Sequence, residues 1–442
     1  MDCHEGRVAY LYAQHSFALY NWLQRTVLKR RRNLMNGAHN RFGAMRIFNT
    51  VVITAALGTF VDILDTTLFQ SVRVPSLQGL GLQGPEIFKA GLMILNVQLA
   101  GLLVGGVLWG ILADRRGRRA VLFGSILTYA LSTLACAWVN SVPMYALLRF
   151  ICGIGLAGEM GAGITLIVEV MPRESRGYGT TICAAAGVSG AVAAGMMATH
   201  LPWRTTYIIG GILGLALFLL RATTYESEMF KHARAARSHG WKLFSDWKQL
   251  RLYLLSLVMG LPLFFVLLII APFAPEIGAS LQPPRVATAA LGTGAVALGL
   301  TFGDVVTGLV SQKLKSRKKP LAFNLVVLFS LLIVFFFVPL PSDKAYGAVI
   351  FALGLASGYF VLFLTNAAEQ FGTNIRGTAA VVAPNVMRAT VIPMTLIMKG
   401  LGGSIGLRYA CAAIGFTAVI AALLSLRALP ETFGRELDYV DE

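Results

Sequence analysis

The feature that most constrains this chain is a succession of long apolar segments. Twelve such segments, each of about 18 residues or more, recur along the 442 residues and are separated by short polar or basic connections. A helix of that length spans the ~30 Å hydrocarbon core of a bilayer. The segments cover residues 47–69, 90–113, 120–140, 143–170, 179–199, 204–221, 252–274, 286–310, 321–338, 346–368, 378–398 and 405–427. The sequence therefore predicts an all-α integral membrane protein with twelve transmembrane helices.

The composition agrees with this class and gives an orientation. Only 13% of the residues are charged, against about 25% in ordinary soluble domains. The net charge of +17 does not indicate a nucleic-acid partner, because most of the 38 lysines and arginines fall in alternate connections. The positive-inside rule then places both termini in the cytoplasm and the protein in the cytoplasmic (inner) membrane.

Several kinds of chemistry find no support in the chain. The five cysteines show no C-x-x-C spacing and the six histidines no ligand spacing, so we expect neither a disulfide framework nor a metal site. The chain has no phosphate-binding G-x-x-x-x-G-K-[ST] loop and no grouping of nucleophile, base and orienting residue in a polar loop. We therefore expect a protein that is not an enzyme, needs no cofactor and draws energy from an ion gradient.

The chain divides into two halves at its longest polar connection. We predict a cytoplasmic tail over 1–45, a six-helix bundle over 46–222, a cytoplasmic linker over 223–251, a second six-helix bundle over 252–428 and a cytoplasmic tail over 429–442. The first tail combines an aromatic stretch with the cluster KRRR. It fits an interfacial helix, a dispensable extension or a true start at Met35 or Met45 equally well.

Sequence motifs repeat between the halves at a shift of about 200 residues. GILADRRGRR begins at Gly110 and GLVSQKLKSRKK at Gly308, each after the second segment of its half. The spacing from Glu169 to Arg176 recurs between Glu369 and Arg376. Such repeats predict two pseudo-symmetric bundles around a site near the bilayer midplane.

The first of these motifs carries a family resemblance. GILADRRGRR resembles the loop signature of the major facilitator superfamily at every defined position. RFICGIGLAGEM from Arg149 and EVMPRESRGYGT from Glu169 resemble its metabolite:proton symporters and organic-ion transporters, and LPET from Leu429 resembles the motif that closes the last helix of its metabolite porters. The second loop copy departs from the signature, with Gln312 in the place of Asp114.

The resemblance implies alternating access, in which two bundles rock about a central cavity. Ion pairs among the loop residues would close the cytoplasmic side. The loop arginines can also serve only as positive-inside anchors, which we favour for Arg115, Arg116 and Arg119. The gate residues that we predict are Gly110, Asp114, Arg115, Gly117, Arg118, Arg119, Glu169, Arg176, Glu369 and Arg376.

Charges inside the membrane are hypotheses of function by default. Counted at 1.5 Å per residue from the segment ends, Asp62, Asp65 and Arg149 share one level in the outer half. One aspartate can neutralise Arg149, and the other is then suited to carry a proton, because two nearby carboxylates compete for ionisation. A static buried salt bridge is the alternative. Glu159 lies in the inner half beside Gly158 and is a third proton-linked candidate.

The second half supplies a cation near the midplane. Arg388 lies ~15 Å from the start of its segment, where a guanidinium can bind a carboxylate or phosphate. It can instead pair with Asp304 or Glu369. With Arg149 and Asn385 it forms the predicted substrate contact.

We therefore predict a monomeric secondary transporter, set in the lipid bilayer, that imports a small anionic metabolite by proton symport. The fifth segment lacks the Gly-Pro pair typical of exporters, which favours import. The alternatives are a proton-coupled exporter or exchanger and a transporter-like sensor that moves nothing.

Overall fold

The computed structural model describes residues 53–170, 176–224, 247–370 and 385–433, although the side chains of some helical residues within these ranges lie outside the description. Every regular element in the described ranges is a helix, as the sequence predicts. The domain boundaries in the two tails and in the linker fall largely outside these ranges and stay predictions.

The helices of the first half follow the predicted segments, except that the first helix continues ten residues beyond the predicted end at residue 69. Residues 53–79 are helical. The next elements are α2 (Pro85–Ala135), η1 (Cys136–Trp138), α3 (Val142–Val170), α4 (Arg176–His200) and α5 (Trp203–Thr224).

The helices of the second half do the same. They are α7 (Trp247–Phe265), η3 (Val266–Ile270), α8 (Ala274–Ser280), α9 (Ala289–Leu314), α10 (Lys318–Phe337), α11 (Asp343–Ala356), α12 (Phe360–Glu369), α14 (Val391–Ile405) and α15 (Leu407–Ala428). Residues 385–389 are also helical.

Helix α2 contains two membrane spans rather than one. Pro85–Leu112 and Val121–Trp138 are each long and apolar enough to cross a bilayer. The ring of Trp109 lies close to Gly124, since a Cβ added at Gly124 would be 2.9 Å from that ring. In a straight helix the two residues would be about 22 Å apart. The chain therefore reverses between them. The loop predicted here is wrong, because residues 111–120 have helical backbone, which their arginines favour.

Two helices are interrupted where the sequence predicts single segments. Pro262 lies inside α7, which continues as the short π-helix η3 and ends at a turn before α8. The predicted segment 346–368 is divided into α11 and α12 at residues 357–359. At this break Gly358 packs directly on Gly303 of α9. Only residues without a side chain allow backbones to approach this closely.

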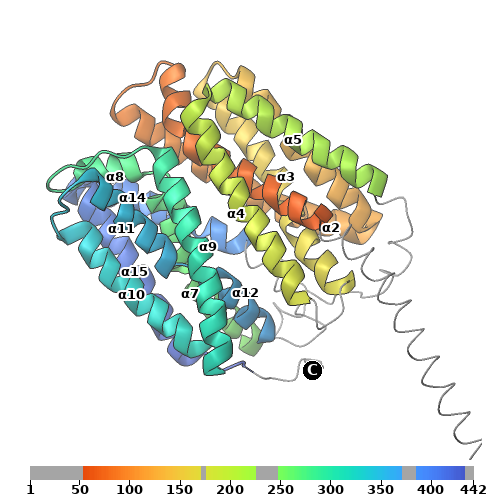
Figure 1. The fold of residues 1–442 in the computed structure, drawn as a ribbon. Coiled ribbons are helices and arrows are strands. Elements are labelled where there is room, and N and C mark those ends of the chain that lie inside the picture. Colours follow the sequence, from red (N-terminus) through yellow and green to blue (C-terminus); the bar gives the residue numbers. More distant parts are fainter. Residues whose placement is uncertain (1–52, 171–175, 225–246, 371–384, 434–442) are drawn as a thin grey trace, which may run out of the picture. The chain divides into compact units, whose positions relative to one another are not determined.

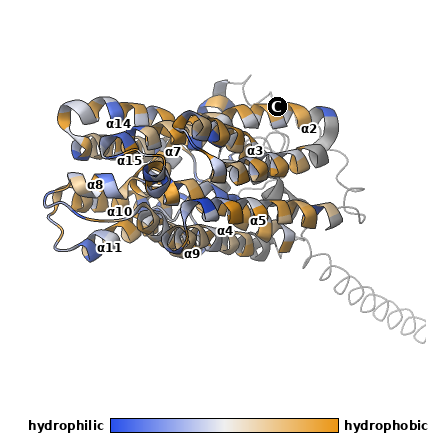
Figure 2. Cartoon of the chain, turned by 90° about the horizontal axis from the view of Figure 1, so that it is seen from above, coloured by the Kyte–Doolittle hydropathy of each residue, from blue (hydrophilic) through white to orange (hydrophobic). Residues whose placement is uncertain are grey.

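The helices of each half gather together (Figure 1). The two groups meet where α4 contacts α9 and where α2 contacts α14. Hydrophobic residues cover most of the length of α3 and α5 (Figure 2), and many large ones are exposed, such as Leu219 and Leu309. An apolar surface of this kind suits a protein whose surroundings are lipid.

The LPET motif, which follows α15, is hydrogen-bonded to the start of α10. The Glu431 carboxylate accepts hydrogen bonds from Ser316 Oγ and from the backbone N–H groups of Arg317 (2.8 Å) and Lys318, which precede and begin α10. Burial would raise the pKa of Glu431, but the hydrogen bonds from Ser316 and these backbone groups outweigh it and lower the pKa to about 2. Glu431 therefore caps α10 as a carboxylate.

Candidate substrate and proton site

We call the end of the helices that holds residues 80–84, 139–141, 201–202 and 281–288 the outer end, after the orientation predicted from the charges. Helix 53–79 contributes acidic, aromatic and basic side chains along its path towards this end. It therefore takes part in the groupings of Asp65, Asp62 and Arg73 described below.

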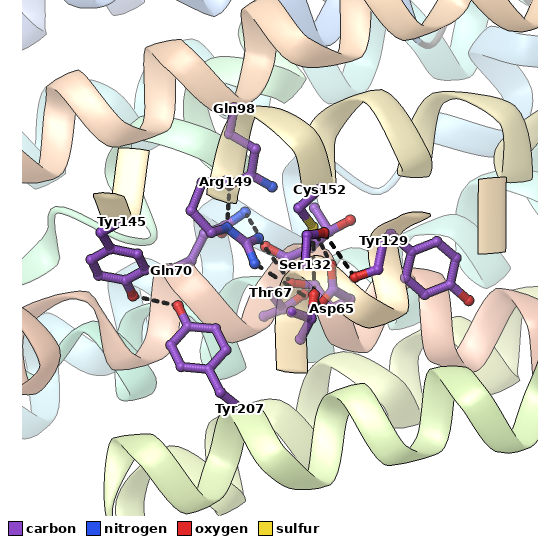
Figure 3. Close-up of polar contacts among 12 residues, drawn as sticks. Asp65, Thr67, Gln70, Gln98, Tyr129, Ser132, Tyr145, Arg149, Cys152 and Tyr207 are labelled. Atoms are coloured by element: carbon purple, nitrogen blue, oxygen red, sulfur yellow. Dashed lines mark hydrogen bonds and ion pairs between the residues drawn. The ribbon is translucent and has the colours of Figure 1, made fainter. Parts of the chain in front are cut away.

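Asp65 and Arg149 form a buried cluster in the first half (Figure 3). Arg149 Nη1 lies 3.9 Å from Asp65 Oδ1, and the two side chains are 0% and 1% exposed. Asp65 also accepts hydrogen bonds from Thr133 Oγ1 and from Cys152 Sγ (2.9 Å). Gln98 Oε1 accepts a bond of 3.2 Å from Arg149 Nε. The sequence left open which aspartate neutralises Arg149, and the structure pairs it with Asp65.

Aromatic side chains enclose the same guanidinium. The rings of Phe69 and Tyr207 lie 5.6 Å and 6.0 Å from Arg149 Cζ, within the range of cation–π attraction. The Tyr207 hydroxyl bonds to that of Tyr145, which in turn lies 3.2 Å from Ser76 Oγ. These contacts lie within the first half and hold Arg149 in place. A contact between Arg149 and substrate stays a prediction.

Asp62 has a different environment, one turn before Asp65 on the same helix. It is 3% exposed and lies within electrostatic range of Arg388, which belongs to the second half and is 5% exposed. The acid and the cation belong to different bundles in the predicted division. Two opposite charges that cross such a boundary can be separated by a movement of one half against the other.

Arg388 and Asn385 present polar atoms that the fold leaves unsatisfied. Asn385 Nδ2 donates to the carbonyl of Ala157 in α3 (3.3 Å). In the part of the chain that the structure describes, buried Arg388 Nη1 and Asn385 Oδ1 have no hydrogen-bond partner. A buried donor left unpaired costs about 1–3 kcal/mol, so a ligand that supplied an acceptor would be favoured here.

The alternative that Arg388 pairs with Asp304 is not observed. Asp304 Oδ1 accepts a hydrogen bond of 3.2 Å from the backbone N–H of Val361, at the start of α12. Asp304 therefore caps the half-helix that follows the break at 357–359. The side chain of Glu369, the other alternative, lies outside the described residues.

The outer end holds an ion pair that the sequence did not reveal. Arg73 Nη1 and Nη2 contact the two carboxylate oxygens of Glu276 at 2.7 and 2.8 Å. Near it, the Ser71 hydroxyl lies 2.9 Å from that of Thr293 in α9. Both contacts join the first half to the second. Sequence analysis did not single out Arg73, because it follows the predicted segment 47–69. A lone cation just beyond the end of a membrane segment is typical of an interfacial anchor.

The predicted cytoplasmic gate lies mainly outside the described side chains. Arg115 is exposed. A Cβ at Gly110 would meet no described atom within 4 Å, so this glycine does not serve a close approach between described helices. The remaining candidates are not described, and their roles stay predictions. These are Asp114, Gly117, Arg118, Arg119, Glu169, Arg176, Glu369 and Arg376. The side chain of Glu159, the third proton-linked candidate, also lies outside the described residues.

The described residues thus form a multi-pass membrane protein with buried charges at its centre. The model of the Major Facilitator Superfamily matches residues 55–393, and the chain belongs to this family. Its fold is that of the family, with twelve transmembrane helices in two bundles. The family consists of transporters rather than enzymes, so the substrate is a small molecule.

Comparison with individual proteins places the chain more closely. It is 26% identical over 369 residues to a putative metabolite transport protein of Haemophilus influenzae, covering 77% of this chain and 86% of that protein. It is 28% identical over 374 residues to a cis,cis-muconate transport protein of Acinetobacter baylyi, covering 78% and 86%. The crystal structure of a D-xylose-proton symporter superposes with a TM-score of 0.65 at 20% identity, covering 88% of this chain and 100% of the other, and shows a shared fold.

Proposed function

We propose that this protein imports a small organic anion together with protons, by alternating access. The observation that carries the proposal is the buried guanidinium of Arg388, whose Nη1 has no hydrogen-bond partner in the described part of the chain and whose charged neighbour is Asp62. A site of this kind favours a carboxylate, because the guanidinium offers two parallel donors in a poorly solvated environment. The muconate relative transports a dicarboxylate, which is consistent with this choice.

Coupling to protons follows from the charges near Arg388. A substrate carboxylate bound to Arg388 adds a second negative charge beside Asp62. Protonation of Asp62 restores neutrality, so anion and proton bind as a neutral set. Asp65 is held by Arg149, Thr133 and Cys152, which suits it to a fixed charge. We therefore assign the proton to Asp62 first, with Asp65 and Glu159 as further candidates.

The substrate contact is tested by uptake into proteoliposomes that contain the purified protein. We use cis,cis-muconate, benzoate and nicotinate as probes, with benzamide as a neutral control. Wild-type protein takes up at least one carboxylate and not the amide. Arg388→Gln raises KM by about tenfold or more, since loss of a charge-assisted pair amounts to about 1.4 kcal/mol or more.

Arg388→Lys serves as the matched variant, because it keeps the charge and loses the two-pronged geometry. It is expected to fall between the wild type and Arg388→Gln. Uptake of benzamide as fast as benzoate, or an unchanged KM in Arg388→Gln, would remove the anion site from this position.

A further inference from the structure

We propose that Arg73 is a second anion-binding residue, at the outer end, where the substrate carboxylate binds before it reaches Arg388. In this structure Glu276 holds that position with its own carboxylate. The inference rests on the proposed function, because it takes the substrate to be an organic anion that enters from the outer end.

The contact between Arg73 and Glu276 shows that a carboxylate fits here. Arg73 Nη2 donates to Glu276 Oε2 at 2.8 Å, and Nη1 lies 2.7 Å from Oε1 as an ion pair, so the guanidinium contacts both oxygens of the carboxylate. Arg73 Nη2 also donates to the carbonyl of Pro272 at 2.9 Å. The ring of Phe273 lies 4.3 Å from Arg73 Cζ and adds cation–π attraction.

Among the described residues, the partners of the Arg73 guanidinium come from the other half of the chain. Pro272, Phe273 and Glu276 lie in the turn after η3 and in α8, whereas Arg73 lies on helix 53–79. If the halves part at the outer end, as alternating access requires, these contacts are lost together. Arg73 then faces water as a cation without the carboxylate of Glu276, and an anion from solution can take its place.

The first half holds Arg73 ready for such an anion. Pro75 lies near the end of the same helix and removes one N–H from its last turns, while Ser76 Oγ donates to the carbonyl of Arg73 at 3.0 Å. Gly91 of α2 leaves room for the side chain, since a Cβ there would lie 2.6 Å from Arg73 Cδ and 2.9 Å from Nη1. These features of the first half fix the backbone at Arg73 and leave room for its side chain.

Glu276 becomes a competitor of the substrate in this arrangement. Its return to Arg73 closes the outer end and displaces the bound anion inwards. The two members of the ion pair then have opposite effects on substrate affinity. A pair that only held the outer end closed would give the same effect whichever member was changed.

The experiment measures KM for a carboxylate probe from each face separately, in right-side-out and inside-out membrane vesicles. The probe is whichever of cis,cis-muconate, benzoate and nicotinate the wild type carries. Arg73→Gln is expected to raise KM about tenfold from the outer face and to leave KM from the inner face unchanged. Glu276→Gln is expected to lower KM from the outer face. Arg388→Gln is the control and raises KM from both faces.

Two further variants distinguish a specific effect on binding from a loss of folding. Arg73→Lys keeps the charge, and Gly91→Ala keeps both charges but displaces the guanidinium, so both should raise KM from the outer face only. Equal KM values in the wild type and Arg73→Gln, or a shift in the same direction in Arg73→Gln and Glu276→Gln, would overturn this inference while the proposed function stands. A wild type that carries no carboxylate refutes the proposed function and the inference together.

Discussion

Replacement of Asp65 by asparagine tests the buried cluster most sharply. The change keeps the shape of the side chain, but its single oxygen can accept from only one of Thr133 and Cys152, which donate to different oxygens of Asp65, and Arg149 loses its counter-charge. Arg149 is fully buried, and 3.9 Å separates the charged atoms of the pair. At an effective dielectric constant of about 20 the attraction is roughly 4 kcal/mol.

Removal of one partner from a buried pair costs about 3–5 kcal/mol, because the other charge is left uncompensated. Only one of the bonds to Thr133 and Cys152 is retained, so we expect Asp65→Asn to cost about 3–5 kcal/mol. The double variant Asp65→Asn/Arg149→Met removes both charges and is expected to recover most of the loss.

The assay is denaturation of purified protein in detergent, followed by tryptophan fluorescence. Asp65→Asn should unfold at clearly lower denaturant than the wild type, with the double variant between them. If Asp65→Asn unfolds at the wild-type midpoint, or if the double variant is less stable than the single one, the cluster does not hold the bundle as we describe.

Three shorter predictions address other elements. Glu431→Gln should destabilise the protein by about 1 kcal/mol, as loss of a helix cap does. The pKa of Glu431 is lowered from 4.5 to about 2, so the stability advantage of the wild type is fully present above pH 4.5 and is lost as the pH falls towards 2. Melting curves of both proteins over that pH range measure this loss. Gly101→Ala should lower the stability of the fold by about 1–3 kcal/mol, because the added methyl group would overlap the carbonyl of Phe150. Gly106→Ala is the control, since no described atom lies within 4 Å of the added methyl group, and it should not lower the stability. Asp304→Ala should remove the cap of α12 and speed hydrogen exchange at Val361, and protection equal to the wild type would contradict that role.

The fold could be predicted from the sequence because the membrane leaves few solutions. Long apolar segments must become helices in lipid, where backbone groups need internal partners. The sequence could not place the interruptions of these helices. The break between α11 and α12 contains no proline, and its cause lies in the packing of Gly358 on Gly303, which are far apart in the chain. The reversal within α2 was predicted, but its helical backbone was not.

The sequence predicted how deep in the membrane the charged residues of the candidate site lie, but not which of them interact. A constant helical rise puts Asp62, Asp65 and Arg149 at one level. Which aspartate meets Arg149, and that Asp62 acts on Arg388, depends on the rotation of helix 53–79 against neighbours from both halves.

The outer ion pair shows the same limit more strongly. Arg73 and Glu276 are 203 positions apart in the chain. Neither residue carries a local signal of its partner. Only the packing of the two halves brings them together.

We propose that the movements of the proton and the anion are linked through Asp62. We would measure muconate, benzoate or nicotinate accumulation in proteoliposomes under an imposed pH gradient, together with exchange of labelled for unlabelled probe at equilibrium. The wild type should accumulate the probe only with the gradient, and Asp62→Asn should lose accumulation but retain exchange. Accumulation that is intact in Asp62→Asn, or wild-type flux that is indifferent to the gradient, would contradict the account.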